Sequence, residues 1–214
     1  MINSYLTIKE SGHTKINLKK SDFICSIART KTENEAQTFI TTMKAQYPKA
    51  NHNCFAYVIG ERSQIQRESD NGEPSGTAGI PILEVLKKNE LRDVTAVVTR
   101  FFGGIKLGTG GLIRAYTQAV STAINNIGVV KCILQKIIYI TISYAQHNRL
   151  KNFLEKNNIT IINTEFTESV TVQIGVNIQE LIAFKESTTN LLSAQVKFTE
   201  GPERYIEITH QLHT

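Results

Sequence analysis

The chain has 214 residues, of which 41% are hydrophobic and 20% are charged, and its formal net charge is +5. This composition predicts a soluble globular protein of one or two domains and argues against a disordered chain. No stretch approaches the roughly 18–20 consecutive apolar residues that cross a bilayer, so no membrane partner is expected. The first residues lack the layout of a signal peptide, and the three cysteines are widely spaced, which predicts a cytoplasmic protein.

The positive charge is concentrated in the first part of the chain. Residues 1–134 hold 17 Lys and Arg against 11 Asp and Glu, a net +6, whereas residues 135–214 hold 7 against 8, a net −1. A basic domain attracts nucleic acid, phosphorylated ligands or acidic protein surfaces. The alternative is that +6 is a modest excess, which many solvated domains carry.

The first elements are a predicted hairpin, a helix and a strand. Residues 13–18 and 22–29 alternate like two strands joined by a turn, and a helix is predicted from a Thr32–Glu35 capping box until just before Pro48. The strand 51–60 places His52 and Cys54 on one face. That pair permits a metal or a Cys–His couple, but a buried structural Cys54 is favoured, because unmodified cysteine is among the most buried residues.

An irregular loop over residues 68–79 precedes the next predicted helix, which runs to about residue 89. Asp70 and Glu73 share this loop, and Thr77 is expected to cap the helix. Paired carboxylates could bind a cation or act as acid and base. They could equally accept hydrogen bonds from backbone N–H groups in a tight loop, and this capping role is favoured.

A glycine-rich segment between Arg100 and Tyr116 separates a buried strand at 94–99 from a helix predicted over 112–127. A glycine bend next to a helix N-terminus presents backbone N–H groups that suit a phosphate, although glycines also serve simply for tight turns. Arg114, expected in the first helical turn, could contact such an anion or could pair with the carboxylates of the preceding loop. The segment contains Gly103, Gly104, Lys106, Gly108, Gly110 and Gly111.

From about residue 135 the pattern becomes a regular βαββαβ series. Strands are predicted at 137–144, 160–166 and 169–176, and helices at 145–157 and 179–192. The last strand is expected in two pieces, 195–199 and 205–209, joined by a turn that contains Gly201 and Pro202. This order is the ferredoxin-like arrangement, and no catalytic constellation is found in it.

Three motifs together resemble a known family, the IMPACT/YigZ family. They are Asn51–Tyr57, Ser69–Gly79 and Arg100–Tyr116, in that order. The resemblance implies an α+β protein of two domains: residues 1–132 with the fold of ribosomal protein S-five domain 2, and residues 135–214 with a ferredoxin-like βαββαβ fold, as in elongation factor G. The sequence differs from the family pattern at Asn71, Phe101 and Thr109, and Asn71 removes one carboxylate, which weakens any two-metal site.

The resemblance and the charge favour a translation-associated binding protein that contacts RNA, the ribosome or a translation factor through a basic first domain. The alternative is an enzyme or phosphate-binding protein with a cleft between loops 69–79 and 100–114. No cofactor or metal is expected, and a catalytic triad and a nucleotide-kinase motif are absent from the sequence, so enzymatic activity stays open. A third possibility is a protein partner on the exposed sheet face of the second domain. The candidate binding residues are His52, Asp70, Glu73, Arg100, Gly103, Gly104, Lys106, Gly108, Gly110, Gly111 and Arg114.

Overall fold

The computed structural model describes residues 2–211 and contains two β-sheets and five α-helices in that range. The chain divides into two compact units, the first built mainly from residues 5–131 and the second mainly from residues 132–207. The predicted α+β class with two domains is confirmed. The predicted boundary near residues 132–135 stays a prediction. None of the helices in the described range is long and apolar enough to cross a membrane.

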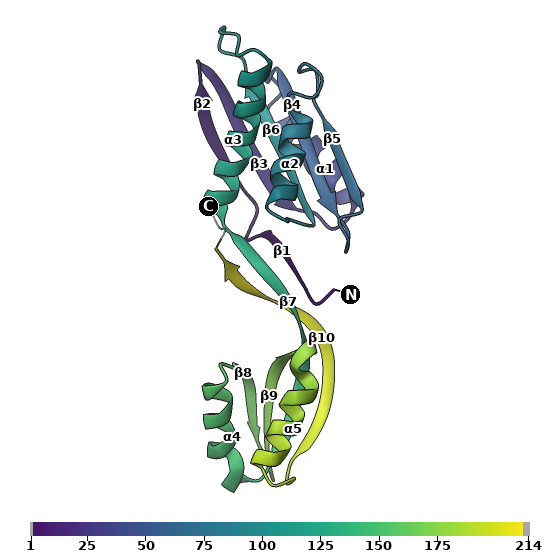
Figure 1. The fold of residues 1–214 in the computed structure, drawn as a ribbon, viewed down its shortest axis with the longest axis vertical. Helices are drawn as coiled ribbons and strands as arrows, with labels where there is room; N and C mark the ends of the chain where they lie inside the picture. Colours follow the sequence, from purple (N-terminus) through teal and green to yellow (C-terminus); the bar gives the residue numbers. More distant parts are fainter. Residues whose placement is uncertain (1, 212–214) are drawn as a thin grey trace. The chain divides into compact units, whose positions relative to one another are not determined.

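The first unit is built on a five-stranded antiparallel sheet with the strand order β2-β3-β6-β4-β5 (Figure 1). The predicted hairpin is confirmed: its turn residues Lys19 and Lys20 both have positive φ, as a two-residue hairpin turn requires. The strands are β2 (Gly12–Leu18), β3 (Ser21–Arg29), β4 (His52–Ile59), β5 (Ile65–Ser69) and β6 (Val94–Phe101).

Helices cover both faces of this sheet. Helix α1 (Glu33–Gln46) packs on one face, and helices α2 (Gly79–Lys88) and α3 (Thr109–Ile127) pack on the other. The predicted alternation along β4 is confirmed, because Cys54 belongs to the core under α2 and α3 whereas Tyr57 belongs to the core under α1. Close packing of α3 follows from three fully buried alanines at four-residue spacing, Ala115, Ala119 and Ala123.

Half of the predicted capping box of α1 forms as expected. The Thr32 side chain accepts a hydrogen bond from the backbone N–H of Glu35 at 3.2 Å. The Glu35 carboxylate, however, accepts from the N–H of Lys31 at 2.7 Å, one residue before the cap. The helix therefore starts where the sequence predicts, with its reciprocal bond shifted by one residue.

The helix and strand bounds predicted for the first unit need three corrections. Helix α3 begins at Thr109 and not at residue 112, so Gly110 and Gly111 form its first turn and Arg114 lies in its second. Strand β5 occupies part of a stretch that the sequence assigned to loop, and strand β1 (Ser4–Ile8) was not predicted. Strand β5 has neither an alternating nor a continuous apolar pattern, because it is an edge strand with two exposed residues.

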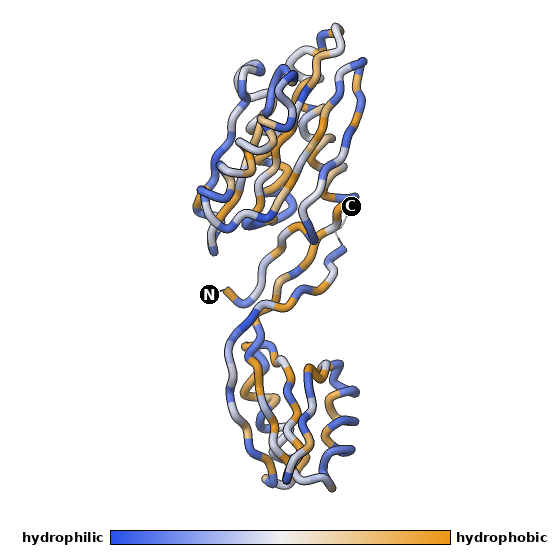
Figure 2. The backbone as a smooth tube through the Cα atoms, turned by 180° about the vertical axis from the view of Figure 1, so that it is seen from behind, coloured by the Kyte–Doolittle hydropathy of each residue, from blue (hydrophilic) through white to orange (hydrophobic). Residues whose placement is uncertain are grey.

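The second unit has the predicted ferredoxin-like order of elements, and its strands lie in the order β10-β7-β9-β8, with β1 also paired to β7. Helices α4 and α5 cover one face, and Figure 2 shows the alternating hydropathy along α4. The elements are β7 (Val129–Ile142), α4 (Tyr144–Lys156), β8 (Ile161–Phe166), β9 (Val170–Asn177), the 3-10 turn η1 (Ile178–Glu180), α5 (Leu181–Leu191) and β10 (Lys197–His210).

One prediction for the second unit is wrong. Strand β10 is continuous and has no turn at residues 200–203. Gly201 lies in the strand because it passes close to β7: a Cβ there would be 3.0 Å from the Tyr139 ring and 3.2 Å from Ile137. In α5, Phe184 packs in the core whereas Ile182, two residues earlier, is 75% exposed.

Candidate functional site

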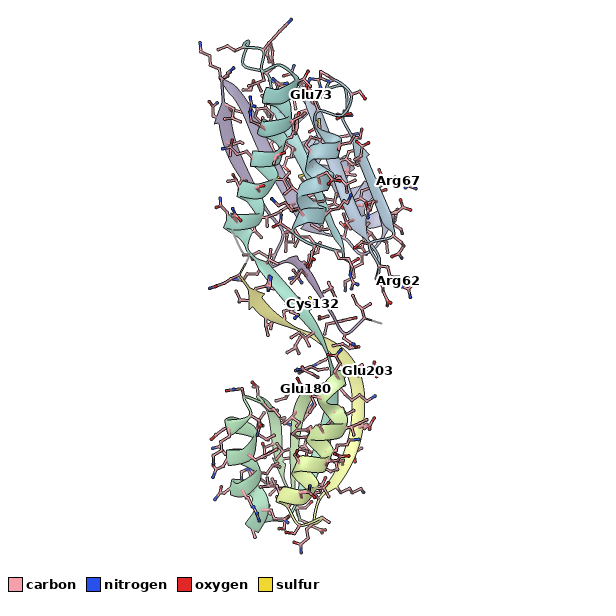
Figure 3. The ribbon with its side chains drawn as sticks, in the orientation of Figure 1. Arg62, Arg67, Glu73, Cys132, Glu180 and Glu203 are labelled. Atoms are coloured by element: carbon pink, nitrogen blue, oxygen red, sulfur yellow. The ribbon has the colours of Figure 1, made fainter. Side chains whose placement is uncertain are left out.

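The candidate site lies at one end of the sheet in the first unit. Strands β3 and β4 begin there, strands β5 and β6 end there, and the N-termini of α2 and α3 point to the same end. Glu73 marks this end in Figure 3, and Arg62 marks the opposite end. A cavity of about 470 Å³ opens at the site. It is lined by Asn51, His52, Glu73, Pro74, Arg100, Phe102, Lys106, Leu107, Gly108, Thr109 and Leu112.

The Asp70 carboxylate accepts hydrogen bonds from the backbone of its own loop. Its Oδ1 accepts from the N–H groups of Ala78 and Gly79, both at 2.9 Å, and its Oδ2 accepts from the N–H of Gly76 at 2.8 Å. Burial raises the pKa of Asp70, but the hydrogen bonds from these N–H groups outweigh burial and leave the pKa below its ordinary value. Asp70 thus takes the favoured capping role for α2.

Thr77 does not cap α2, contrary to the sequence prediction. Its hydroxyl donates instead to the carbonyl of Pro74 at 2.7 Å, and the N-cap position of α2 is Ala78, which has no side-chain cap. The Asp70 carboxylate reaches the same N–H groups from across the loop. A cap supplied from eight residues upstream leaves no local signature in the sequence, which explains the error.

Glu73 and Arg100 form a buried ion pair below the cavity. Arg100 Nη1 donates to Glu73 Oε1 at 2.6 Å, and the side chains are only 6% and 3% exposed. Tyr116 from α3 donates its hydroxyl to the same carboxylate oxygen at 2.8 Å. The guanidinium lies against the Phe23 and Phe102 rings, with centroids 5.3 and 5.4 Å away. The pair is therefore an integral part of the fold as well as the base of the cavity.

Cys54 is a buried thiol behind the ion pair and supports the structural role that the sequence favoured. Its Sγ lies 3.3 Å from the hydroxyl of Tyr116 and donates to the carbonyl of Asp70 at 2.9 Å. Burial raises the pKa of the Cys54 thiol to about 12, and burial likewise raises the pKa of Tyr116. At neutral pH Cys54 is protonated, so it is not a thiolate nucleophile.

His52 presents one ring nitrogen to the cavity. Its Nδ1 lies 3.1 Å from the backbone carbonyl of Asn71, and because a carbonyl can only accept, Nδ1 carries the hydrogen. In the neutral ring Nε2 is then an acceptor, and it lies 3.9 Å from Glu73 Oε2. That separation is too long for a direct hydrogen bond.

The glycine-rich segment combines structural glycines with an uncapped helix end. A Cβ on Gly103 would collide with the carbonyl of Lys20, and Gly108 has a φ of 71°, so the fold needs glycine at both positions. Helix α3 has no side-chain cap and no acidic residue in its first turn. Its first helical bond runs from Leu112 N to Gly108 O, which leaves the preceding N–H groups of the first turn without an intrahelical partner; of these residues, Thr109 lines the cavity.

Only some of the predicted binding residues line the cavity. His52, Glu73, Arg100, Lys106 and Gly108 line it. Six others do not: Asp70, Gly103, Gly104, Gly110, Gly111 and Arg114.

The predicted pairing of Arg114 with the upstream acids does not occur. Asp70 is occupied by backbone N–H groups and Glu73 by Arg100, and Arg114 is exposed in the second turn of α3. Sequence reasoning missed the apolar cavity lining, notably Phe102 and Leu107. Large apolar residues inside a glycine-rich loop are the signal that could have found them.

Metal binding finds no support in the described range, where no group of three or more His, Cys, Asp and Glu residues could hold an ion. The arrangement instead offers hydrogen-bond acceptors at the base of a cavity and cationic or N–H groups at its rim.

Family profiles match both parts of the chain. The Impact N-terminal domain matches residues 19–124, and a domain of unknown function (DUF1949) matches residues 140–195. The chain belongs to the IMPACT family, as its motifs predict.

Two curated relatives and one solved structure are similar to the chain over most of its length. It is 47% identical to the IMPACT family member YvyE of Bacillus subtilis over 97% of this chain and 95% of that protein. It is 34% identical to YigZ of Escherichia coli over 78% of this chain and 83% of that protein. A crystal structure described as that of a hypothetical protein is 30% identical, with a TM-score of 0.60 over 92% of this chain and 97% of the other.

Proposed function

We propose that this IMPACT family member is a translation-associated protein that binds RNA, free or on the ribosome, through the basic end of its first unit. We define the basic end by four exposed cations: Lys19 and Lys20 in the β2–β3 turn, Lys106 in the glycine-rich loop, and Arg114 on α3. The observation that carries the proposal is that the acids near this end are engaged within the fold, whereas the four cations are not.

The four cations lie on neighbouring segments. Gly103 packs against the backbone of Lys20, and its N–H donates to the Ser21 hydroxyl at 3.2 Å, which fixes the glycine-rich loop on the β2–β3 turn. The loop leads directly into α3, and the N–H groups at the start of that helix add partial positive charge. Phosphate oxygens are suited to this combination of lysine, arginine and helix N-terminus.

The acids near this end are already satisfied within the fold. Asp70 accepts three backbone hydrogen bonds, and Glu73 neutralises Arg100. Asp22, which follows the β2–β3 turn, pairs with Lys15 at 2.7 Å. The sequence has no acidic residue between Asp93 and Glu155, a stretch that covers β6, the glycine-rich loop and α3. Within the described residues, none of the four cations of the basic end has an ion pair. The positive electrostatic potential of these four cations is therefore available to attract an anionic ligand from solvent.

Charge reversal with a matched control tests the proposal. The double variant Lys106→Glu with Arg114→Glu removes two cations of the basic end. The control, Lys31→Glu with Arg62→Glu, removes two exposed cations at the opposite end of the same sheet. Arg100 is left intact because it is buried in the Glu73 pair.

We expect the basic-end variant to weaken binding of a labelled single-stranded RNA in fluorescence anisotropy. We also expect it to reduce the slope of log affinity against log salt by about 0.7 for each phosphate contact that is lost. The control should bind like the unmodified chain, since its charges lie far from the site. Equal affinity of the two folded variants would refute the proposal. Co-purification from cells with and without nuclease separates an RNA contact from contact with a translation factor.

The cavity favours a second candidate, a small phosphorylated ligand. Its volume of about 470 Å³ lies within the range of roughly 300–1,000 Å³ that small-molecule sites occupy. Lys106 and the α3 N-terminus would hold the phosphate, as in the first proposal. A thermal-shift screen with nucleotides, inorganic phosphate and divalent ions distinguishes the two, because a saturating small ligand raises the melting temperature without RNA. No stabilisation by any small compound, together with RNA binding, favours the first proposal.

A further inference from the structure

The base of the cavity holds a carboxylate oxygen that lacks a hydrogen-bond donor from the protein. Glu73 Oε1 receives both Arg100 and Tyr116, whereas Oε2 has no hydrogen bond from any residue between positions 2 and 211. The side chain is only 3% exposed, yet Oε2 is not among the fully buried polar atoms without a partner, so it opens into the cavity that Glu73 lines. An acceptor left free at the base of a cavity is available to a hydrogen-bond donor of a ligand.

A second acceptor faces the same space. His52 donates from Nδ1 to the carbonyl of Asn71, so in the neutral ring Nε2 is an acceptor, 3.9 Å from Glu73 Oε2. Two acceptors at this spacing suit a single –NH₂ group, which has two N–H donors pointing in different directions. A carbonyl at the same position would face two acceptors and would be repelled.

The walls of the cavity between this acceptor pair and the rim are largely apolar. Phe102 is 45% exposed although it is large and aromatic, and Leu107, Leu112 and Pro74 lie in the same lining, to which Asn51 and Thr109 add polar groups. An exposed aromatic ring with apolar neighbours is a surface on which a nucleobase can stack or pack. At the rim, Lys106 and the N-terminal residues of α3 lie where a phosphate attached to such a base can reach them.

We infer that the cavity binds one unpaired nucleotide whose base carries an exocyclic amino group, that is adenine, cytosine or guanine and not uracil. The amino group donates to Glu73 Oε2 and His52 Nε2, the base packs on Phe102, and the phosphate lies at Lys106. This inference rests on the proposed RNA binding and adds to it a selectivity for the base. An unpaired base is required, because in a paired base one of the two amino hydrogens already donates to the partner base and this site uses both.

The full chain is tested against single-stranded homopolymers of A, C and U of equal length in fluorescence anisotropy. The A and C oligomers should bind about 5- to 150-fold tighter than the U oligomer, which is the discrimination that a good pair of hydrogen bonds to a base edge provides. The mononucleotides AMP, CMP and UMP, titrated separately, distinguish a free nucleotide from a nucleotide within RNA as the natural occupant.

Two variants separate the base contact from the phosphate contact. His52→Ala should lose the preference for A and C over U and keep the salt slope. Lys106→Ala should weaken all three oligomers by a similar factor and keep the preference. Circular dichroism checks that each variant folds. If a variant does not fold, the preference of the unmodified chain for A and C over U still tests the inference.

Equal binding of A, C and U oligomers to the unmodified chain would overturn the base selectivity and leave the proposed RNA binding intact. Failure of the unmodified chain to bind any of the oligomers would overturn both. An acidic peptide that binds the cavity while all RNA fails would assign the site to a protein partner and would also overturn both.

Discussion

Removal of the Asp70 carboxylate is predicted to destabilise the first unit strongly. Asp70 joins β5 to the start of α2 through three hydrogen bonds from the backbone N–H groups of Gly76, Ala78 and Gly79, each 2.8–2.9 Å long. A hydrogen bond to a charged group contributes about 1.5–3 kcal/mol, and loss of an N-cap costs about 0.5–2 kcal/mol. Because the three bonds share one carboxylate, they do not add fully.

We therefore expect Asp70→Ala to lower the free energy of unfolding by about 3 kcal/mol in urea denaturation at neutral pH. Asp70→Asn should lose about 1–2 kcal/mol, because its carbonyl keeps the bonds from Ala78 and Gly79 while its NH₂ group faces the N–H of Gly76. A loss below about 0.5 kcal/mol for Asp70→Ala would show that the Asp70 carboxylate is not the cap of α2.

The Asp70 carboxylate also makes the free energy of unfolding depend on pH in a predictable direction. The pKa of Asp70 is lower in the folded protein than the roughly 3.9 of an unfolded chain, so its stabilisation is complete above that value. It is lost as the pH falls through the folded-state pKa. The stability difference between the unmodified chain and Asp70→Asn should be constant around neutrality and shrink at acid pH. A difference that grows on acidification would contradict the assignment.

Three further predictions concern positions that the structure distinguishes. Gly103→Ala should lower the free energy of unfolding by at least about 2 kcal/mol, because the added methyl group collides with a backbone carbonyl. Gly110→Ala should raise it by about 0.5 kcal/mol, because the added methyl group has open space in a helix. Similar effects of the two substitutions in thermal melts would be inconsistent with this geometry. Arg100→Ala should cost about 3–5 kcal/mol by leaving a buried carboxylate unpaired, and a loss below about 1 kcal/mol in urea denaturation would mean that the pair is solvated. Ile182→Ser should lower the free energy of unfolding by less than about 0.5 kcal/mol and Phe184→Ala by about 3–5 kcal/mol, and equal losses would contradict the different burial of the two side chains.

The fold was largely predictable because its signals are local. Alternation in β4 and the alanines of α3 at four-residue spacing place the core faces correctly. Gly201 and Pro202 form a dipeptide typical of a turn, yet they lie within a continuous strand because the glycine lets β10 approach β7. That reason depends on the neighbouring strand, so the sequence of the segment itself does not contain it.

The candidate site was less predictable because its contacts are long-range. Both acids of the 68–79 loop were identified, but their partners were not. Glu73 pairs with a residue 27 positions away, and Tyr116 reaches it from 43 positions away. The start of α3 at Thr109 was also not predictable from the glycine-rich sequence. Gly110 and Gly111 are poor helix formers, but tertiary packing places them in the first turn of the helix.

The most direct test of the account is to map the RNA contact on the protein. A single-stranded RNA is titrated onto the ¹⁵N-labelled chain, and the amide shifts are followed by NMR at low salt. We predict that the largest shifts fall on residues 103–111 and on the β2–β3 turn, and that they disappear as salt is raised. Shifts confined to the opposite end of the sheet, around residues 60–63, or to the second unit would contradict RNA binding at the basic end.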